Sequence, residues 1–296
     1  MKNLKDLRIG VLMGGFSSER EVSLQSGTCI ADALQKNGYQ VTRIDVTPAF
    51  SEKAGDLDID IAFIALHGEF GEDGQIQQIL DARHIPYIGS GAEASRVSMD
   101  KVESKRIFKA QDIPTPAYIV IDADKPQDAE GFDEISFPLV VKPVNGGSSI
   151  GITIVRTKDL LDAALHEALR YDSRVIIEEY IKGRELTVSV LAGEALPVIE
   201  LRTRREFYDY EAKYNDDDTE YLCPVEISDT LQAQAKELAV KTNSALGARG
   251  FCRVDIMMDG KNRLYVLELN TIPGFTTHSL LPKAAAAAGI SFPELC

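Results

Sequence analysis

Residues 251–270, FCRVDIMMDGKNRLYVLELN, consist of two apolar, strand-like runs on either side of a short turn at 260–262. Side chains alternate along a strand, so Arg253 and Asp255 share one face of the first run while their apolar neighbours take the other. The pattern predicts an antiparallel β-hairpin with one buried face and one polar face.

The polar face of this hairpin also receives Glu268 and Asn270 from the second run. Pairing of the two strands can bring them next to Arg253 and Asp255. Two carboxylates and an amide oxygen are hard ligands, suited to a magnesium ion that also binds substrate phosphates, and an arginine suits a phosphoryl group or an oxyanion. An ordinary solvated hairpin face is the alternative interpretation.

The segment after the hairpin contains a turn and the expected start of a helix. The Pro-Gly pair at 273–274 favours a turn, and Thr277 or His278 is expected to cap a helix that begins near Ser279. The first N–H groups of a helix can bind an anion such as a carboxylate. An anion site is therefore expected beside the metal site, although a turn and a cap without a ligand also explain the pattern.

A glycine-rich loop lies within PLVVKPVNGGSSIGITIV (138–155), where Lys142 ends a strand and NGGSS (145–149) follows. Backbone N–H groups, serine hydroxyls and the lysine charge can together hold phosphates. The loop is not a Walker loop, because no GK[ST] opens a helix. Three acidic residues near the end of a later strand can hold ribose hydroxyls: Glu178, Glu179 and Glu185.

The first part of the chain alternates between strands and helices, with strand-like runs at 8–13, 40–46 and 61–66. This alternation predicts a parallel sheet. The segments GGFSSEREVS (14–23) and HGEFGEDGQIQ (67–77) each follow a strand, so both loops open at the same edge of the sheet. Their polar side chains predict a substrate pocket there, and the absence of GxGxxG disfavours dinucleotide binding.

Composition and length indicate a multi-unit globular protein of mixed α/β class, α+β in part. The chain has 296 residues, of which 44% are hydrophobic and 26% charged, with a formal net charge of -14. This charge argues against nucleic-acid or anionic-membrane binding, and no signal peptide or apolar span is evident, so a cytoplasmic protein is expected. The four cysteines form no CxxC pair, so neither a disulfide framework nor a zinc site is indicated. We expect an N-terminal parallel-sheet unit (1–98), a central unit (99–182) and a C-terminal unit (183–296).

A long polar and aromatic segment, RTRREFYDYEAKYNDDDTEY (202–221), interrupts the third unit. It is longer than an ordinary connection, so we expect it to act as a lid over the substrate. A disordered excursion is the alternative.

Seven segments, in order, resemble the D-alanine–D-alanine ligases of the ATP-grasp superfamily. They are GGFSSEREVS (14–23), ALHGEFGEDGQIQ (65–77), GSG and SMDK (within 89–101), VVKPVNGGSSIG (140–151), FYDYEAKY (207–214), RVDIMM (253–258) and LELNTIPGFTTHSLLP (267–282). Seven matches spread over nearly the whole chain make a chance similarity very improbable. The resemblance implies a three-unit ATP-grasp fold and a bacterial cytoplasmic homodimer that takes part in peptidoglycan synthesis.

The resemblance also implies how ATP and metal ions are held. Lys101 and Lys142 are expected at the phosphates, with the Ser148 loop closing over them. The full expected nucleotide set is Lys101, Lys142, Ser148, Ser149, Glu178, Glu179, Glu185 and Lys213. Asp255, Glu268 and Asn270 match the family's ligands for two magnesium (or manganese) ions.

The implied reaction joins two molecules of D-alanine through a D-alanyl phosphate, with release of ADP and phosphate. Glu19 is expected to hold the first ammonium group, next to His67. Arg253 and the N–H of Gly274 are expected to stabilise the oxyanion. The remaining expected residues are Ser279 and Leu280 at the second carboxylate, and Ser148 and Tyr214 among the catalytic groups.

Some features depart from the family pattern. Tyr180 stands where many relatives carry tryptophan, and Gly146 where some carry glutamate; both are expected to tune nucleotide contacts. The family normally continues its terminal helix past Cys296, so weaker packing beneath the second substrate site is expected. Two alternatives therefore stay open: a ligase that takes D-lactate second, which Tyr214 disfavours, and a nucleotide-binding protein that has lost catalysis.

Overall fold

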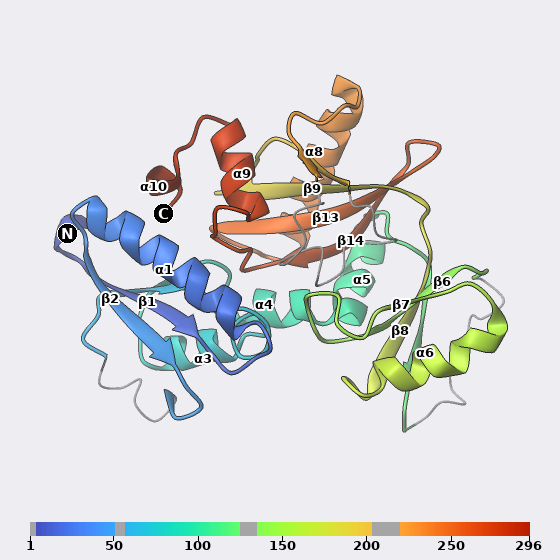
Figure 1. Ribbon diagram of the computed structural model, residues 1–296, viewed down its shortest axis with the longest axis horizontal. Coiled ribbons are helices and arrows are strands. Elements are labelled where there is room, and N and C mark those ends of the chain that lie inside the picture. The colour runs from blue at the N-terminus through green and yellow to red at the C-terminus, as the bar shows by residue number, and fades with distance from the viewer. Residues whose placement is uncertain (1–3, 51–56, 125–134, 203–219) are drawn as a thin grey trace.

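The computed structural model describes residues 4–50, 57–124, 135–202 and 220–296. It contains three β-sheets, each with helices packed against it. Figure 1 shows the N-terminal sheet at the left, the sheet of β5 to β8 at the lower right and the sheet that contains β9, β13 and β14 above them. No helix in these described stretches is long and apolar enough to cross a membrane.

The first sheet is parallel, with strand order β2-β1-β3-β4. Its strands are β1 (Arg8–Gly14), β2 (Gln40–Val46), β3 (Ile61–Ile64) and β4 (Tyr87–Ile88). A short 3-10 turn (Leu4–Asp6) precedes them, and the helices are α1 (Arg20–Lys36), α3 (Gln75–Ala82) and α4 (Ala92–Met99). Strand β1 lies between two neighbours and is buried along most of its length, which explains its uninterrupted apolar sequence. The predicted parallel sheet is confirmed.

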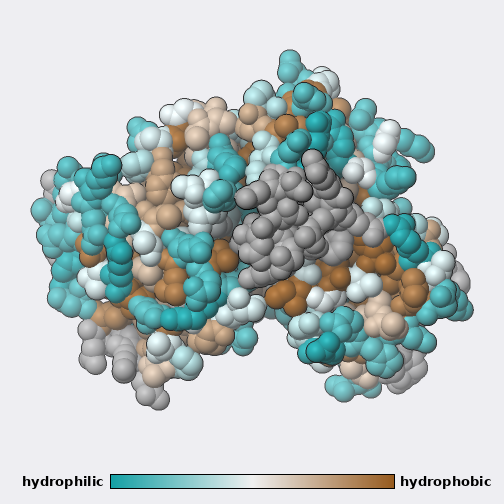
Figure 2. Space-filling view, viewed as in Figure 1, coloured by the Kyte–Doolittle hydropathy of each residue, from teal (hydrophilic) through white to brown (hydrophobic). Residues whose placement is uncertain are grey.

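The second sheet is antiparallel, with strand order β5-β8-β6-β7. Its strands are β5 (Tyr118–Asp122), β6 (Leu139–Pro143), β7 (Thr153–Val155) and β8 (Arg174–Glu179). Helix α5 (Lys101–Ala110) precedes it, and a 3-10 turn (Lys158–Leu160) leads into α6 (Leu161–Ala168). Buried Ala164 and Ala168 let α6 pack against the apolar face of the sheet. In Figure 2 hydrophilic side chains cover most of the visible surface, and hydrophobic ones show at the right near this sheet and also over the N-terminal unit at the left.

The third sheet contains the predicted hairpin. Its strands are β9 (Gly183–Leu191), β10 (Glu194–Ala195), β11 (Ile199–Arg202), β12 (Glu220–Leu222), β13 (Phe251–Asp259) and β14 (Leu264–Asn270). The helices are α8 (Asp229–Ala245), α9 (Leu280–Ala287) and α10 (Phe292–Leu295). Arg253 is opposite Asn270 and Asp255 is opposite Glu268, so the predicted polar face of the hairpin is confirmed.

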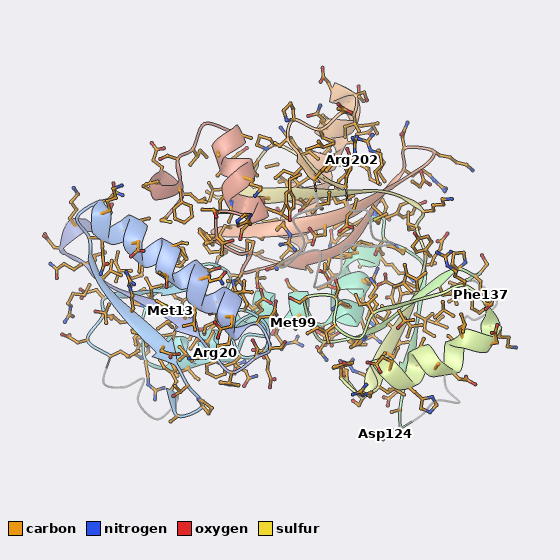
Figure 3. The ribbon with its side chains drawn as sticks, viewed as in Figure 1. Met13, Arg20, Met99, Asp124, Phe137 and Arg202 are labelled. Atoms are coloured by element: carbon orange, nitrogen blue, oxygen red, sulfur yellow. The ribbon has the colours of Figure 1, made fainter. Side chains whose placement is uncertain are left out.

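One hydrophobic core joins the first and third sheets. The rings of Phe63 from β3, Phe251 from β13 and Phe275 pack together, with centroid separations of 5.1–5.9 Å. All three are buried, and α1, α9 and α10 contribute to the same core. Met99 and Arg20 lie towards the middle of the molecule, whereas Asp124 and Phe137 lie at the outer end of the second unit (Figure 3). Because the first and third sheets share this core, the loops at their facing ends are held in fixed positions relative to one another.

Most of the predicted elements are present with small shifts in their bounds. The predicted cap at Thr277 or His278 is wrong, because Ser279 is the N-cap of α9. The Ser279 hydroxyl accepts a hydrogen bond from the N–H of Thr276 and shares another with the Thr276 hydroxyl. The unit boundaries after residues 98 and 182 stay predictions. The predicted lid at 202–221 lies largely outside the described residues.

The start of α5 is fixed by Asp100, whose carboxylate accepts hydrogen bonds from the N–H groups of Val102 and Glu103. The same carboxylate binds Arg174 of β8 at 2.6 Å. Burial raises the pKa of Asp100, but the hydrogen bonds from Arg174 and the backbone outweigh it, so this pKa lies below its usual value. Asp100 thereby holds the first residue of α5, Lys101, against the second sheet.

Asp100→Asn is expected to destabilise the chain by about 1 kcal/mol at pH 7, because asparagine still caps a helix but loses the charge that binds Arg174. The folded-state pKa is depressed, so this stabilisation is present above the unfolded pKa and is lost as the pH falls through the folded one. Urea unfolding of both proteins from pH 7 downwards checks this. A difference in unfolding free energy that stayed constant with pH would show that the charge of Asp100 does not contribute through its pKa.

Candidate functional site

Three adjoining cavities run between the units in the described part of the chain. A cavity of about 260 Å³ lies between the N-terminal loops and the β14–α9 segment. A second, of about 470 Å³, lies between the second and third sheets, and one of about 30 Å³ connects the two. We call them the amino-acid, nucleotide and connecting cavities. Glu268 lines all three.

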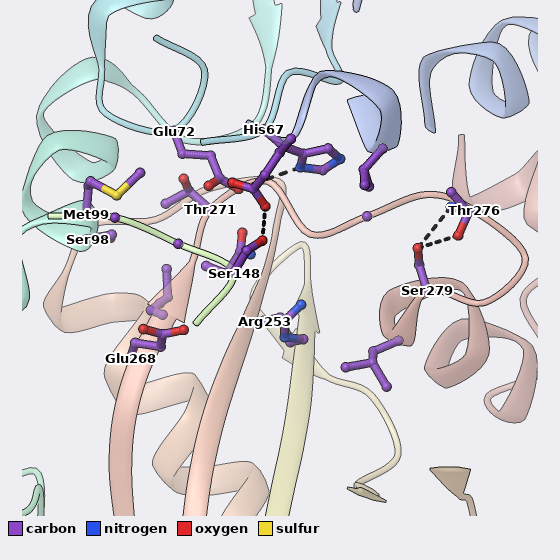
Figure 4. Close-up of a pocket in the computed structure, with 18 of the residues that line it drawn as sticks. His67, Glu72, Ser98, Met99, Ser148, Arg253, Glu268, Thr271, Thr276 and Ser279 are labelled. Carbon is purple, nitrogen blue, oxygen red and sulfur yellow. Dashed lines mark hydrogen bonds and ion pairs between the residues drawn. The ribbon is translucent and has the colours of Figure 1, made fainter. Parts of the chain in front are cut away.

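The N-terminal sheet contributes one wall of the amino-acid cavity. Glu19 directly precedes α1, and His67 and Glu72 lie in the loop after β3, so all three lie at the carboxyl edge of the parallel sheet as predicted. All three are buried. The hydroxyl of Ser148, from the glycine-rich loop of the second unit, donates a hydrogen bond to the Glu19 carboxylate. Figure 4 shows this contact next to His67 and Glu72.

His67 is held on both sides of its ring. Its Nδ1 lies 3.7 Å from Glu72 Oε1, and its Nε2 lies 3.2 Å from the hydroxyl of Ser26. The Ser26 hydroxyl also accepts a hydrogen bond from the N–H of Phe275, at 3.2 Å. Burial lowers the pKa of His67, but the hydrogen bond and charge of Glu72 outweigh it and raise this pKa above its ordinary value. Glu72 and Ser26 therefore fix the orientation of the His67 ring in this wall.

The hairpin supplies the opposite wall. The Arg253 guanidinium donates to both oxygens of Asp255, at 2.9 and 2.8 Å, and Thr187 donates to Asp255 Oδ1 at 2.8 Å. A β-bulge follows Asp255, so Leu267 is an extra residue in β14 and lines the nucleotide cavity next to Glu268. The alternation of the predicted strand gave no sign of this bulge.

The carboxylates of the hairpin fit a divalent metal ion. Asp255 and Glu268 are cross-strand neighbours that both line the nucleotide cavity, and Asn270 follows on the same face and lines the amino-acid cavity. Carboxylate and amide oxygens beside a phosphate site are the donors that magnesium and manganese prefer. The residues present are therefore compatible with the predicted metal ions.

Lysines gather around the connecting cavity. The Nζ of Lys101 donates to the carbonyl of Gly146 at 2.6 Å and lies 4.0 Å from Glu268. Lys142 lines the nucleotide and connecting cavities, and its Nζ lies 2.7 Å from Glu178. Glu178 also binds the buried Lys105 at 3.1 Å. Its carboxylate thus links two lysines, and Glu178, Glu179 and Glu185 all line the nucleotide cavity. Their predicted contacts with adenine and ribose stay predictions.

The glycine-rich loop crosses the connecting cavity in a left-handed conformation. Ser148 and Ser149 have φ angles of 51° and 61°, which non-glycine residues seldom adopt. The loop is held at its start by Asp172, which accepts hydrogen bonds from the backbone and side chain of Asn145. Ser149 lines the nucleotide and connecting cavities, and Ser148 lines the amino-acid cavity.

The β14–α9 loop closes the amino-acid cavity. Gly274, Ser279 and Leu280 all line it. A Cβ at Gly274 would lie 2.5 Å from the Ser279 hydroxyl, so a larger residue there would force the Ser279 side chain to move. In Figure 4 Thr276 and Ser279 lie at one end of the cavity and Glu268 at the other, with Arg253 between them.

The structure thus brings together every described residue of the predicted site around the three cavities. Gly146 and Tyr180, which depart from the family pattern, also line cavities. Lys213 and Tyr214 lie outside the described residues.

Several polar residues of the site were missed. Arg184 binds both oxygens of Glu200 at 2.7 and 2.6 Å in the wall of the nucleotide cavity, and Lys105, Ser26 and Thr187 support other members. Pairing of β9 with β11 and β13 could have pointed to Arg184, Glu200 and Thr187, but no pattern indicates Lys105 or Ser26.

Comparison with known proteins agrees with this arrangement. The family model described as "D-ala D-ala ligase C-terminus" matches residues 107–296, and the one described as "D-ala D-ala ligase N-terminus" matches residues 8–56 and 47–90. A D-alanine–D-alanine ligase of Hydrogenovibrio crunogenus is 46% identical over 288 residues, which cover 97% of this chain and 92% of the relative.

Solved structures extend the likeness to the fold. The D-alanine–D-alanine ligase from Bacillus anthracis is 42% identical with a TM-score of 0.87, and its structure complexed with ATP is 39% identical with a TM-score of 0.85; both comparisons cover 98% of this chain and 94% of the other. VanG D-Ala:D-Ser ligase from Enterococcus faecalis is 30% identical with a TM-score of 0.87, over 98% of this chain and 97% of that one. The chain, with its parallel N-terminal sheet and two antiparallel sheets, therefore belongs to the D-alanine–D-alanine ligase family.

Proposed function

We infer that this chain uses ATP to join two molecules of D-alanine into D-alanyl-D-alanine, a precursor for peptidoglycan. The observation that carries this inference is the position of Glu268, whose side chain lines the amino-acid, connecting and nucleotide cavities. Nucleotide phosphates and an amino-acid carboxylate would therefore meet beside one carboxylate that can hold a divalent ion. Membership of the ligase family supports the reaction class.

We place ATP in the nucleotide cavity, with its phosphates directed into the connecting cavity. Apolar side chains such as Ile181, Met257 and Leu267 suit a nucleobase. The acidic residues Glu178, Glu179 and Glu185 line the same cavity and are proposed at the nucleoside, and the Glu178 carboxylate also binds Lys142. The groups proposed at the phosphates are Lys101, Lys142, Ser148 and Ser149, together with Lys213.

Asp255, Glu268 and Asn270 are the proposed ligands of two magnesium or manganese ions. When bound, such ions offset the phosphate charge and polarise the phosphoryl group that is transferred. Lys101 and Lys142, which also line the connecting cavity, add positive charge there.

In the proposed reaction a carboxylate oxygen of the first D-alanine attacks the γ-phosphorus of ATP, and ADP leaves. The amine of the second D-alanine then attacks the carbonyl carbon of the acyl phosphate, loses a proton, and phosphate leaves with the C–O bonding pair. Glu19 and His67 are placed to bind the first D-alanine, and Arg253 and the N–H of Gly274 to stabilise the oxyanion. Ser279 and Leu280 are proposed at the second carboxylate, and Ser148 and Tyr214 at the closure of the site.

The family resemblance also supports a homodimer and a cytoplasmic location, which we propose on that ground. A sedimentation measurement of the purified chain tests the first, and fractionation of cells tests the second.

The function is tested by incubating the purified chain with ATP, magnesium and D-alanine, alone or with D-serine or D-lactate. We expect phosphate release in step with D-alanyl-D-alanine, identified by mass spectrometry. A preference for D-serine or D-lactate as second substrate at neutral pH would change the assigned product. ATP binding without any product would leave a nucleotide-binding protein that lacks ligase activity.

A further inference from the structure

Lys105 is a buried cation that lines none of the three cavities. It lies on α5 one turn after Lys101, so the two side chains share a face of the helix. Lys101 lines the amino-acid and connecting cavities, whereas the Lys105 side chain is 0% exposed behind them. A buried lysine is costly unless its charge is compensated, so its contacts indicate what it does.

The ammonium group of Lys105 reaches the phosphate site through a single carboxylate. Its Nζ lies 3.1 Å from Glu178 Oε1, and the other oxygen, Oε2, lies 2.7 Å from the Nζ of Lys142. Glu178 is 2% exposed, so water scarcely screens either contact. Lys105 and Lys142 thus bind opposite oxygens of one buried carboxylate.

The net charge of the group formed by Lys105, Glu178 and Lys142 depends on Lys105. Burial raises the pKa of Glu178, but the two lysines outweigh it and hold this pKa at about 2. Burial lowers the pKa of Lys105 to about 8 in spite of Glu178, so the cation persists at neutral pH. With Lys105 present the three groups have a net positive charge, whereas Glu178 and Lys142 alone would neutralise one another.

Lys105 is also fixed to the strand that carries Glu268. Its Nζ donates to the hydroxyl of Thr115 at 2.5 Å, and this hydroxyl donates to the carbonyl of Val266 in β14 at 2.8 Å. The N–H of Val266 in turn donates to the carbonyl of Pro114 at 2.7 Å. One side chain therefore connects α5, β8 and β14, the elements that provide Lys101, Glu178 and Glu268.

We propose that Lys105 is a positioning residue for ATP: by sharing Glu178 with Lys142 it holds the Lys142 ammonium in place and keeps its charge available to the phosphates. The proposal rests on the proposed nucleotide site. A purely structural role would change the stability of the chain without a specific change in its affinity for ATP.

The test is the equilibrium affinity for ATP in the presence of magnesium, measured by calorimetry on the full chain without D-alanine. Lys105→Met is expected to weaken ATP binding about tenfold, the effect of one charge at an intermediate effective dielectric. In the background of Glu178→Gln the same substitution is expected to change the affinity less than about threefold, because no carboxylate remains to neutralise Lys142.

Lys109→Met is the matched control. Lys109 lies one turn further along α5, is exposed, and its Nζ lies 4.4 Å from the Tyr118 ring centre, whereas Lys105 lies 5.6 Å from the same centre. It should leave ATP affinity unchanged.

The Michaelis constant for D-alanine should stay within about twofold in Lys105→Met, which separates a phosphate effect from general damage to the site.

Equal losses of ATP affinity from Lys105→Met in both backgrounds, or no loss in either, would overturn the proposal. If Lys105→Met does not fold, Lys105→Gln replaces it in the same comparison, because glutamine keeps donors for Thr115 and Glu178 while it removes the charge. Failure of the wild-type chain to bind ATP would instead count against the proposed nucleotide site itself.

Discussion

Arg253→Ala is expected to lower the rate of dipeptide formation at least about a hundredfold, which corresponds to a loss of roughly 3 kcal/mol of transition-state stabilisation. Arg253 lines the amino-acid cavity, with a side chain that is 13% exposed. A cation in so dry a position stabilises charge that develops on a reacting carbonyl far more than a solvated one does. The rate is measured as phosphate release at saturating ATP and D-alanine.

Arg253→Ala should still bind ATP, because Arg253 is not one of the described residues that line the nucleotide cavity. The Michaelis constant for ATP is therefore expected to change less than about threefold. Arg253→Lys should give an intermediate rate, since an ammonium keeps the charge but loses the two-pronged contact with Asp255.

Arg263→Ala is the matched control for Arg253. Arg263 lies on the same hairpin and binds Asp259 at 2.7 Å, but its side chain is 63% exposed and lines none of the three cavities. It should leave turnover unchanged. A similar fall in both variants would indicate damage to the hairpin, and full activity in Arg253→Ala would exclude Arg253 from the mechanism.

The hairpin shows how far a repeating pattern can predict a site. Alternation along the two strands placed Arg253, Asp255, Glu268 and Asn270 on one face, and the register pairs them as expected. The same logic brought Glu19 and His67 together, because the carboxyl ends of neighbouring parallel strands meet at one edge. Site residues whose positions depend on strand geometry can therefore be predicted from the sequence.

The rest of the site depends on contacts between units. Lys105 is an ordinary helical lysine by pattern, and only the packing of α5 against β8 brings it to Glu178. The same packing makes Glu178 a link between two lysines, a contact that no local pattern predicted. The bulge at Leu267 similarly depends on how β14 pairs with β13. Tertiary contacts between segments far apart in sequence leave no local signal.

Local hydrogen bonds also decided the start of α9. Thr277 and His278 are plausible caps by residue type and position. Instead Ser279 is the N-cap, and its hydroxyl accepts from the N–H of Thr276 in the preceding loop. The Ser279 hydroxyl also lies close to Gly274, where an added Cβ would meet it at 2.5 Å.

Glu268→Gln is expected to lower turnover about a thousandfold, because loss of a metal-binding carboxylate removes several kcal/mol of phosphoryl-transfer stabilisation. Glu268 is the side chain shared by the three cavities, and it lies 4.0 Å from Lys101. Glutamine has nearly the same shape but is a weaker ligand for a hard cation. The measurement is the rate as a function of magnesium and of manganese concentration, and the variant should need more of either metal.

Glu194→Gln, at an exposed position on β10 of the same sheet, should match the wild type in rate and in metal dependence. Glu268→Asp keeps the negative charge on a shorter side chain. If the carboxylate acts as a metal ligand, this variant should be faster than Glu268→Gln at high magnesium concentration. If it only tunes the Lys101 charge, aspartate and glutamine should respond alike to added metal. A Glu268→Gln enzyme with unchanged metal dependence would remove this residue from the metal site and leave Asp255 and Asn270 too few to hold two ions.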